Sequence, residues 1–83
     1  MSIIYNECLG NTKLVYSAFA EENKETNSNI YGISVKDNNK NSEVILRNFT
    51  SIKENAIDFI ETLMRNTVSP DFVKEIAEDY LLA

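Results

Sequence analysis

One polar segment between two apolar stretches carries oxygen-bearing side chains at alternate positions, as the start of a calcium loop does. Asp37, Asn39 and Asn41 stand where the first three ligands of such a loop would stand. An EF-hand loop also requires glycine at its sixth position and a bidentate glutamate at its twelfth, but Ser42 and Asn48 occupy these positions. Asp, Asn and Ser are also typical turn residues. We therefore predict a turn between two strands here, and no metal site.

A second group of oxygen-bearing side chains lies near the C-terminus, where four carboxylates are spaced as on the outer face of a helix: Asp71, Glu75, Glu78 and Asp79. General acid–base catalysis by a carboxyl group requires burial, or a partner that moves its pKa towards neutrality, and we expect these groups to be exposed. The chain also has no histidine, and its two glycines provide no phosphate-binding loop. We predict no enzyme, no catalytic residues and no cofactor.

These four residues are instead our candidates for binding a partner. Glu78 and Asp79 lie in the last turns of the predicted helix, where the helix dipole disfavours a negative charge by about 0.3 to 1 kcal/mol. One explanation is a contact with a basic surface on another protein. The other is a solvated face, or a pairing with Arg47 or a lysine of the sheet, because exposed ion pairs and exposed repulsions are both weak.

Cys8 is the only cysteine, which excludes an internal disulfide and a cysteine cluster for zinc. A free cysteine usually behaves as a small buried hydrophobe, and a catalytic thiol would need a nearby base, of which the commonest, histidine, is absent. We therefore expect Cys8 to be buried and structural.

Length and composition predict one small globular domain. The 83 residues are 43% hydrophobic and 25% charged, with no apolar run of the roughly 18 residues that a membrane span requires. The N-terminus lacks the basic and apolar regions of a signal peptide, so we expect a cytoplasmic protein without membrane contact. The net charge of −5 consists of −1 up to Thr50 and −4 from Ser51 onward. This acidity makes nucleic acid an improbable partner.

Up to Thr50 the pattern is that of strands. β-Branched and aromatic residues dominate 3–9 and 13–20, and Gly10 and Asn11 between them are typical of a hairpin turn. The polar residues 21–29 predict a loop, and further strands are predicted over 30–36 and 43–49. Aromatic residues on a sheet can also stack RNA bases, but Tyr5, Tyr16 and Tyr31 lack the basic and glycine-rich surroundings of RNA-recognition modules.

From Ser51 onward the period is helical. Ser51 and Glu54 fit a capping box, and the helix should run to about Asn66. Its apolar stripe is formed by Ile52, Ala56, Phe59, Ile60 and Leu63. Ile57 and Met64 lie further round the helix and should face a second helix.

The second helix is predicted to begin at Ser69 as N-cap, with Pro70 at the first helical position. Its apolar residues recur at i, i+3, i+4, i+7 and i+8: Val73, Ile76, Ala77, Tyr80 and Leu81. The prediction is an α+β fold, with an antiparallel four-stranded meander in residues 1–50 and, in residues 51–83, two helices packed on one face of the sheet. The uncovered face could then carry an apolar patch and mediate a homodimer, with candidates Ile4, Val15, Phe19, Ile30, Ile45 and Phe49.

Three short elements of this sequence resemble a family of small uncharacterised proteins from Firmicutes: Tyr31-Gly32-Ile33, the Ser69-Pro70 helix start, and the acidic pair Glu78-Asp79. The resemblance covers roughly the last two thirds of the chain. It implies a cytoplasmic bacterial protein of unknown role, and it assigns no catalytic residue.

Our leading hypothesis is a noncatalytic protein–protein interaction module, which could also form a homodimer. The alternative is an acidic inhibitor that imitates nucleic acid and binds a basic protein. Its carboxylates would come from both helices: Glu54, Asp58 and Glu61 with Asp71, Glu75 and Glu78. A small enzyme is a third hypothesis and the weakest.

Overall fold

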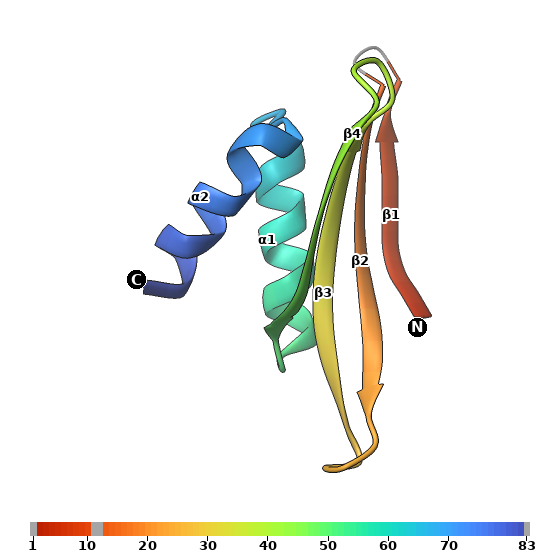
Figure 1. Cartoon of the computed structure of the whole chain (residues 1–83), viewed down its shortest axis with the longest axis vertical. Coiled ribbons are helices and arrows are strands. Elements are labelled where there is room, and N and C mark those ends of the chain that lie inside the picture. Colours follow the sequence, from red (N-terminus) through yellow and green to blue (C-terminus); the bar gives the residue numbers. More distant parts are fainter. Residues whose placement is uncertain (1, 11–12, 83) are drawn as a thin grey trace.

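A four-stranded antiparallel sheet is followed by two helices that lie on one of its faces (Figure 1). The computed structural model describes residues 2–10 and 13–82. The elements are β1 (Ser2–Leu9), β2 (Leu14–Asn23), β3 (Ser28–Asp37), β4 (Ser42–Thr50), α1 (Lys53–Arg65) and α2 (Pro70–Leu82). The strands pair in chain order, β1-β2-β3-β4. The predicted α+β fold is confirmed. The predicted turn partner Asn11 lies outside the described residues.

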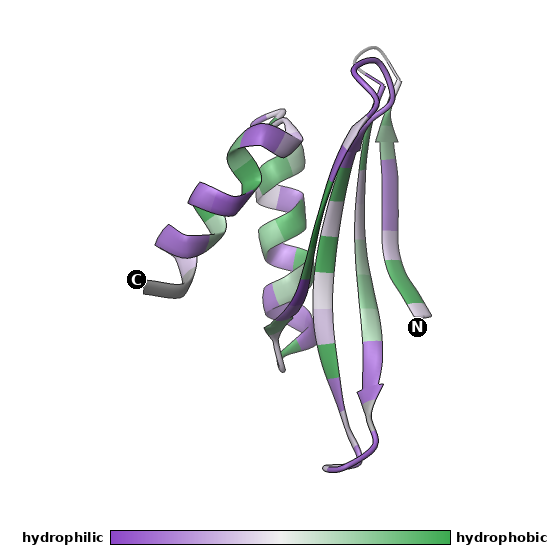
Figure 2. Ribbon diagram, in the orientation of Figure 1, coloured by the Kyte–Doolittle hydropathy of each residue, from purple (hydrophilic) through white to green (hydrophobic). Residues whose placement is uncertain are grey.

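The core lies between the helices and the two central strands. Tyr16 of β2 and Ile33 and Val35 of β3 are fully buried there, because alternate residues of a strand point to the same face. Figure 2 shows apolar and polar residues alternating along β3. The helices contribute the other half of the core: Ala56, Phe59, Ile60, Leu63, Val73 and Ala77.

The hairpin of β2 and β3 is longer than the sequence predicts. Residues 21–29 were expected to form a loop, but Glu21 pairs with Ile30 and Glu22 with Asn29, so the turn contains only residues 24–27. The polar composition wrongly predicted a loop because this part of the hairpin projects beyond the helices (Figure 1). Strand pairing there requires backbone hydrogen bonds but no buried apolar face.

Gly32 in β3 has a steric role. A Cβ at this position would lie 2.5 Å from the ring of Phe19 and 2.6 Å from the carbonyl oxygen of Leu46. β4 is irregular opposite this glycine, and Asn48 within the irregularity has φ 55°. The backbone of β4 therefore approaches β3 more closely than a residue with a side chain would allow.

The start of α1 differs from the predicted capping box. The N-cap is Ile52, which makes no side-chain capping bond, so Ser51 lies before the cap and Glu54 is only the second helical residue. The hydroxyl of Thr50 instead accepts a hydrogen bond from the amide of Ile52 at 3.1 Å. The carbonyl of Ile52 accepts bonds from the amides of Asn55 and Ala56. Because Ile52 precedes the first helical turn, its side chain is exposed and does not join the buried stripe.

The end of α1 forms a Schellman motif. Thr67 has φ 51°, and its amide donates to the carbonyl of Met64 at 3.1 Å. The next amide, of Val68, donates to the carbonyl of Leu63 at 3.0 Å. This turn directs the chain into α2, which begins at Pro70 as predicted.

The two helices cover overlapping sets of strands, and α1 also reaches β2. α1 lies against β2, β3 and β4, whereas α2 lies against β4 and β3. The second neighbour of Met64 is consequently β1, because the hydroxyl of Tyr5 donates to the Met64 sulfur at 3.6 Å. The sequence predicted α2 in this place, and the structure shows β1 as a neighbour of Met64. The contact between the helices includes Tyr80 of α2, whose ring lies 5.0 Å from that of Phe59.

Candidate functional site

The four predicted partner-binding residues lie on the exposed side of α2. The opposite side of this helix is anchored in the core by Val73 and Ala77, which are buried. Because a helix advances about 100° per residue, residues at i, i+4, i+7 and i+8 from Asp71 share the outward side. Asp71, Glu75, Glu78 and Asp79 are all exposed there. We call this group the acidic face of α2.

The acidic face contains one basic residue and is flanked by apolar surface. Lys74 is exposed three residues after Asp71 and four before Glu78, positions at which side chains on a helix are neighbours. Phe72 exposes 58% of its surface in the first turn of the same helix. Exposed aromatic residues beside fixed charges are common in protein interfaces.

Arg47 does not serve as the partner of these carboxylates. Its Nε lies 3.4 Å from the Glu21 carboxylate on β2, across the sheet face that α2 does not touch. The ion pair of Arg47 is thus with the sheet, and its side chain remains 66% exposed.

A small groove separates α2 from β4. It has a volume of about 170 Å³, with apolar lining from Leu46, Phe49 and Ala77 and charged lining from Arg47, Lys74 and Glu78. A space of this size accepts one apolar side chain. Glu78 thus belongs both to the acidic face and to the groove.

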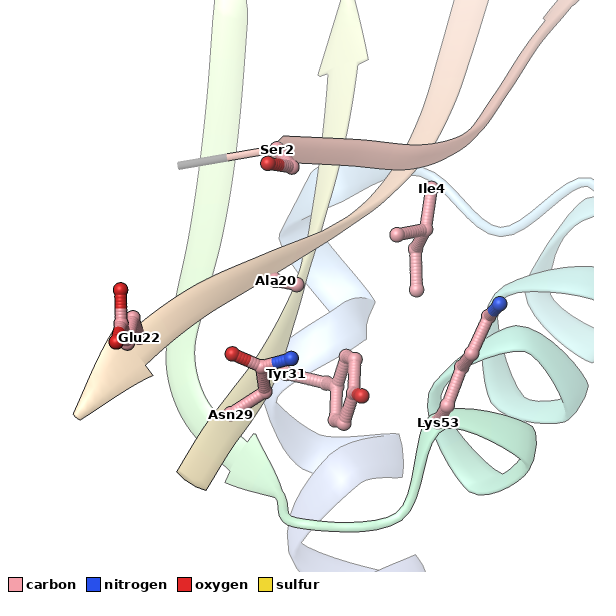
Figure 3. Close-up of a pocket in the computed structure, with 7 residues that line it drawn as sticks. All are labelled: Ser2, Ile4, Ala20, Glu22, Asn29, Tyr31 and Lys53. Carbon is pink, nitrogen blue, oxygen red and sulfur yellow. The ribbon is translucent and has the colours of Figure 1, made fainter. Parts of the chain in front are cut away.

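A larger hollow of about 390 Å³ lies at the opposite end of the sheet, where the β2–β3 hairpin extends past α1. Figure 3 shows Tyr31 of β3 and Lys53 of the first turn of α1 on its wall, with Ile4 of β1 above them. Among the described residues that line it, Glu22 is the one carboxylate.

The segment around Asp37 is the predicted turn. Residues 38–41 connect β3 to β4, and Asn41 has φ 57°. The Asp37 carboxylate accepts bonds from the amides of Asn39 at 2.9 Å and Lys40 at 3.2 Å. Across residues 2–10 and 13–82, no three His, Cys, Asp or Glu side chains are grouped so that they could hold a metal ion. The role of Asp37 is that of a turn residue.

Asp37 is more buried than the sequence suggests, and it affects a neighbouring tyrosine. Only 6% of its surface is exposed. Burial raises the pKa of Tyr16, and the negative charge of Asp37 raises this pKa further. The hydroxyl of Tyr16 is therefore protonated at neutral pH and donates to the carbonyl of Val68 at 2.8 Å.

Cys8 is exposed, contrary to the prediction. It pairs with Val15 on the helix-free face of β1, an edge strand, so no second layer covers it. The predicted apolar patch is also divided: Ile4 and Phe49 pack towards the helices, whereas Val15, Phe19, Ile30 and Ile45 occupy the helix-free face. Sequence alternation could not separate these two sets because irregular pairing in β1 and β4 shifts the alternation.

The DUF6514 family, a family of unknown function, matches residues 4–83. The chain belongs to this family. The match includes the N-terminal hairpin, which the resemblance noted in the sequence did not cover. No curated protein and no solved structure matches the chain. In the part of the chain that the structure describes, neither helix has the length and apolar character needed to cross a membrane.

Proposed function

We propose that this protein is a noncatalytic interaction module, and that the acidic face of α2 binds a basic surface on another protein. The observation that supports this function is the exposure of Asp71, Glu75, Glu78 and Asp79 on a helix whose other side is held in the core. Anchored in this way, the carboxylates have fixed positions before binding. Preorganised charge of this kind favours rapid and specific association with a surface of opposite sign.

The position of the charges along the helix supports the same proposal. Glu78 and Asp79 lie in the last turns of α2, where the helix dipole disfavours them, and α2 has no basic residue in its last turn. Each costs about 0.3 to 1 kcal/mol of stability at such a position. A binding role would explain why acidic residues stand there.

We propose that the partner contributes lysine or arginine together with an apolar side chain. Phe72 presents an exposed ring on α2, and the groove beside Glu78 has room for one apolar group. The bacterial cytoplasm, which the Firmicutes resemblance implies, is the compartment that we propose.

Mimicry of nucleic acid is the second candidate. Glu54 and Asp58 on α1 are exposed and Glu61 is half-buried, which adds carboxylates beyond those of α2. This function requires the carboxylates of both helices to contact one basic groove. Lys53 and Arg65, exposed on the same helix, reduce the net charge of α1 to −1 and weigh against it.

The test uses the tagged chain and its interaction partners from a native extract. The variant Glu75→Lys/Glu78→Lys should lose a basic partner that the unchanged chain captures. The matched control Glu7→Lys/Glu22→Lys makes the same change of charge at two exposed residues of the sheet and should retain it. Equal loss in both variants would show that overall charge, rather than α2, governs binding. The mimicry hypothesis replaces ours under two conditions. The unchanged chain displaces nucleic acid from the captured protein, and Glu54→Lys/Asp58→Lys also loses this partner.

A further inference from the structure

The helix-free face of the sheet, which we call the outer face, is organised in rows across the strands. Residues that pair between neighbouring strands share one face, so the register defines these rows. In order along the strands, the rows are Cys8–Val15–Lys36–Glu43, Asn6–Ser17–Ser34–Ile45, Ile3–Phe19–Gly32, and Glu21–Ile30. Arg47 lies in the irregular part of β4, opposite the row of Gly32.

The middle of the outer face is flat, because it consists of small residues and one buried aromatic ring. Phe19 lies over Gly32 and exposes only 3% of its surface although no helix covers it. Ser17 and Ser34 in the adjacent row are small. Ile3 and Ile45 stand at the two edges and expose 57% and 51% of their surfaces. A flat centre with exposed β-branched residues around it is suited to packing against a second sheet, at about 10 Å.

The charges of the outer face balance, in contrast to those of α2. Glu21 and Glu43 oppose Lys36 and Arg47, which gives a net charge of zero. α2 carries four acidic residues and Lys74, a net charge of −3. Two copies of the chain that met through α2 would therefore repel each other, whereas two copies that met through the outer face would not.

We propose that the outer face binds the outer face of a second copy, about a two-fold axis perpendicular to the strands. The axis runs along the row that contains Ser34 and Ile45, midway between the row of Lys36 and the row of Gly32. This rotation brings each end of the face over the opposite end of the other copy. Glu43 then faces Arg47 of the second copy, and Lys36 lies over Gly32.

The same rotation places β4 over β4 of the second copy, with Ile45 close to the axis and opposite its own counterpart. The two most exposed apolar groups of the outer face, Ile3 and Ile45, are thereby covered, and Glu43 and Arg47 of the two copies meet as opposite charges. This self-complementarity is what an isologous interface requires, and it favours a second copy over an unrelated protein.

The area that a stable dimer requires is a modest share of the surface of this chain. A standard interface buries about 800 Å² per partner, roughly a seventh of the 5506 Å² surface of this chain. The outer face is one complete side of a two-layer molecule (Figure 1). The helices lie on the opposite side, so the dimer would present two acidic faces of α2 outward. The dimer does not depend on the proposed function of those faces.

Sedimentation of the purified chain over a range of concentrations tests the dimer. We expect a concentration-dependent dimer that Ile45→Lys weakens by about tenfold or more, because two like charges would be placed opposite each other beside the axis of the interface. The matched control is Ile52→Lys, since Ile52 is exposed to the same extent, 51%, but lies outside the outer face. A chain that is monomeric at every concentration, or a dimer that both variants weaken equally, overturns the proposal.

Disulfide crosslinking tests the position of the axis. In a Cys8→Ser background, Ile45→Cys should form a covalent dimer under mild oxidation, because the two introduced thiols lie near the axis. Ile52→Cys in the same background should remain monomeric. Crosslinking through position 52 and not through position 45 would contradict the proposed interface.

Discussion

The hydroxyl of Tyr16 donates a hydrogen bond to the carbonyl oxygen of Val68 at 2.8 Å and thereby joins the second strand to the turn between the two helices. Tyr16 is fully buried. Val68 closes the Schellman motif of α1 through its amide, so both polar groups of its backbone are engaged at the junction of sheet, α1 and α2.

Tyr16→Phe should lower the free energy of unfolding by about 1 to 3 kcal/mol, because the Val68 carbonyl would be left without its donor in the core. Urea denaturation measures this loss. Tyr31→Phe removes a hydroxyl beside the open hollow and should change stability by less than about 0.5 kcal/mol. Equal effects of the two substitutions would contradict a specific role of the Tyr16 hydrogen bond.

Stability should decline at alkaline pH. The pKa of Tyr16 is raised in the folded state by burial and by Asp37, and that of Tyr5 by burial and the nearby Glu7 and Glu61. The folded state therefore keeps protons that the unfolded chain releases above about pH 10, so folding is progressively disfavoured as pH rises above that value. Denaturant titrations on both sides of about pH 10 should show this decline, and Tyr16→Phe should make it shallower. An unchanged slope in that variant would show that Tyr16 does not contribute.

Gly32→Ala should destabilise the fold by about 1 to 3 kcal/mol, since the added methyl group would meet the Phe19 ring and the Leu46 carbonyl. The ring can rotate away, but the carbonyl belongs to the backbone of β4. The matched control is Gly10→Ala, because a Cβ there would meet no atom within 4 Å. Thermal unfolding of the two variants provides the comparison. Equal melting temperatures would show that β4 adjusts freely.

Thr67→Gly should stabilise the protein by about 0.5 to 1 kcal/mol. Thr67 adopts φ 51° at the end of α1, where a β-branched residue is strained and glycine is preferred. Thr67→Ala is the control, because alanine retains the Cβ that causes the strain and should bring no comparable gain. Chemical denaturation of both variants shows whether the gain in stability comes from relieving the backbone strain or from removing the threonine side chain. A gain in the alanine variant as large as in the glycine variant would contradict the explanation.

Most of the architecture was predictable because its determinants are local. Alternation such as Tyr31, Ile33 and Val35 defines a strand, and the Ser69-Pro70 pair marks the start of α2. The outward orientation of Asp71, Glu75, Glu78 and Asp79 follows from helical periodicity and is observed. Their role in binding stays a prediction.

The features that the sequence did not predict depend on contacts and positions that arise only in the folded chain. Phe19 is buried by lying over Gly32 of the next strand, and Cys8 is exposed because β1 is an edge strand, neither of which a linear pattern contains. The capping box failed because Thr50 positions the chain so that α1 begins one residue later than Ser51 would place it. The rows of the outer face became visible only through the register.

The projecting end of the β2–β3 hairpin has a consequence for local opening of the folded protein. The pair Glu22–Asn29 lies near the turn and both side chains are exposed, so this end of the hairpin can separate without exposing the buried core. Amide hydrogen exchange there should follow local opening, while the amides beside Tyr16 and Val35 exchange only when the whole chain unfolds. For the same reason, a peptide inserted between Lys24 and Asn27 should leave the rest of the structure intact.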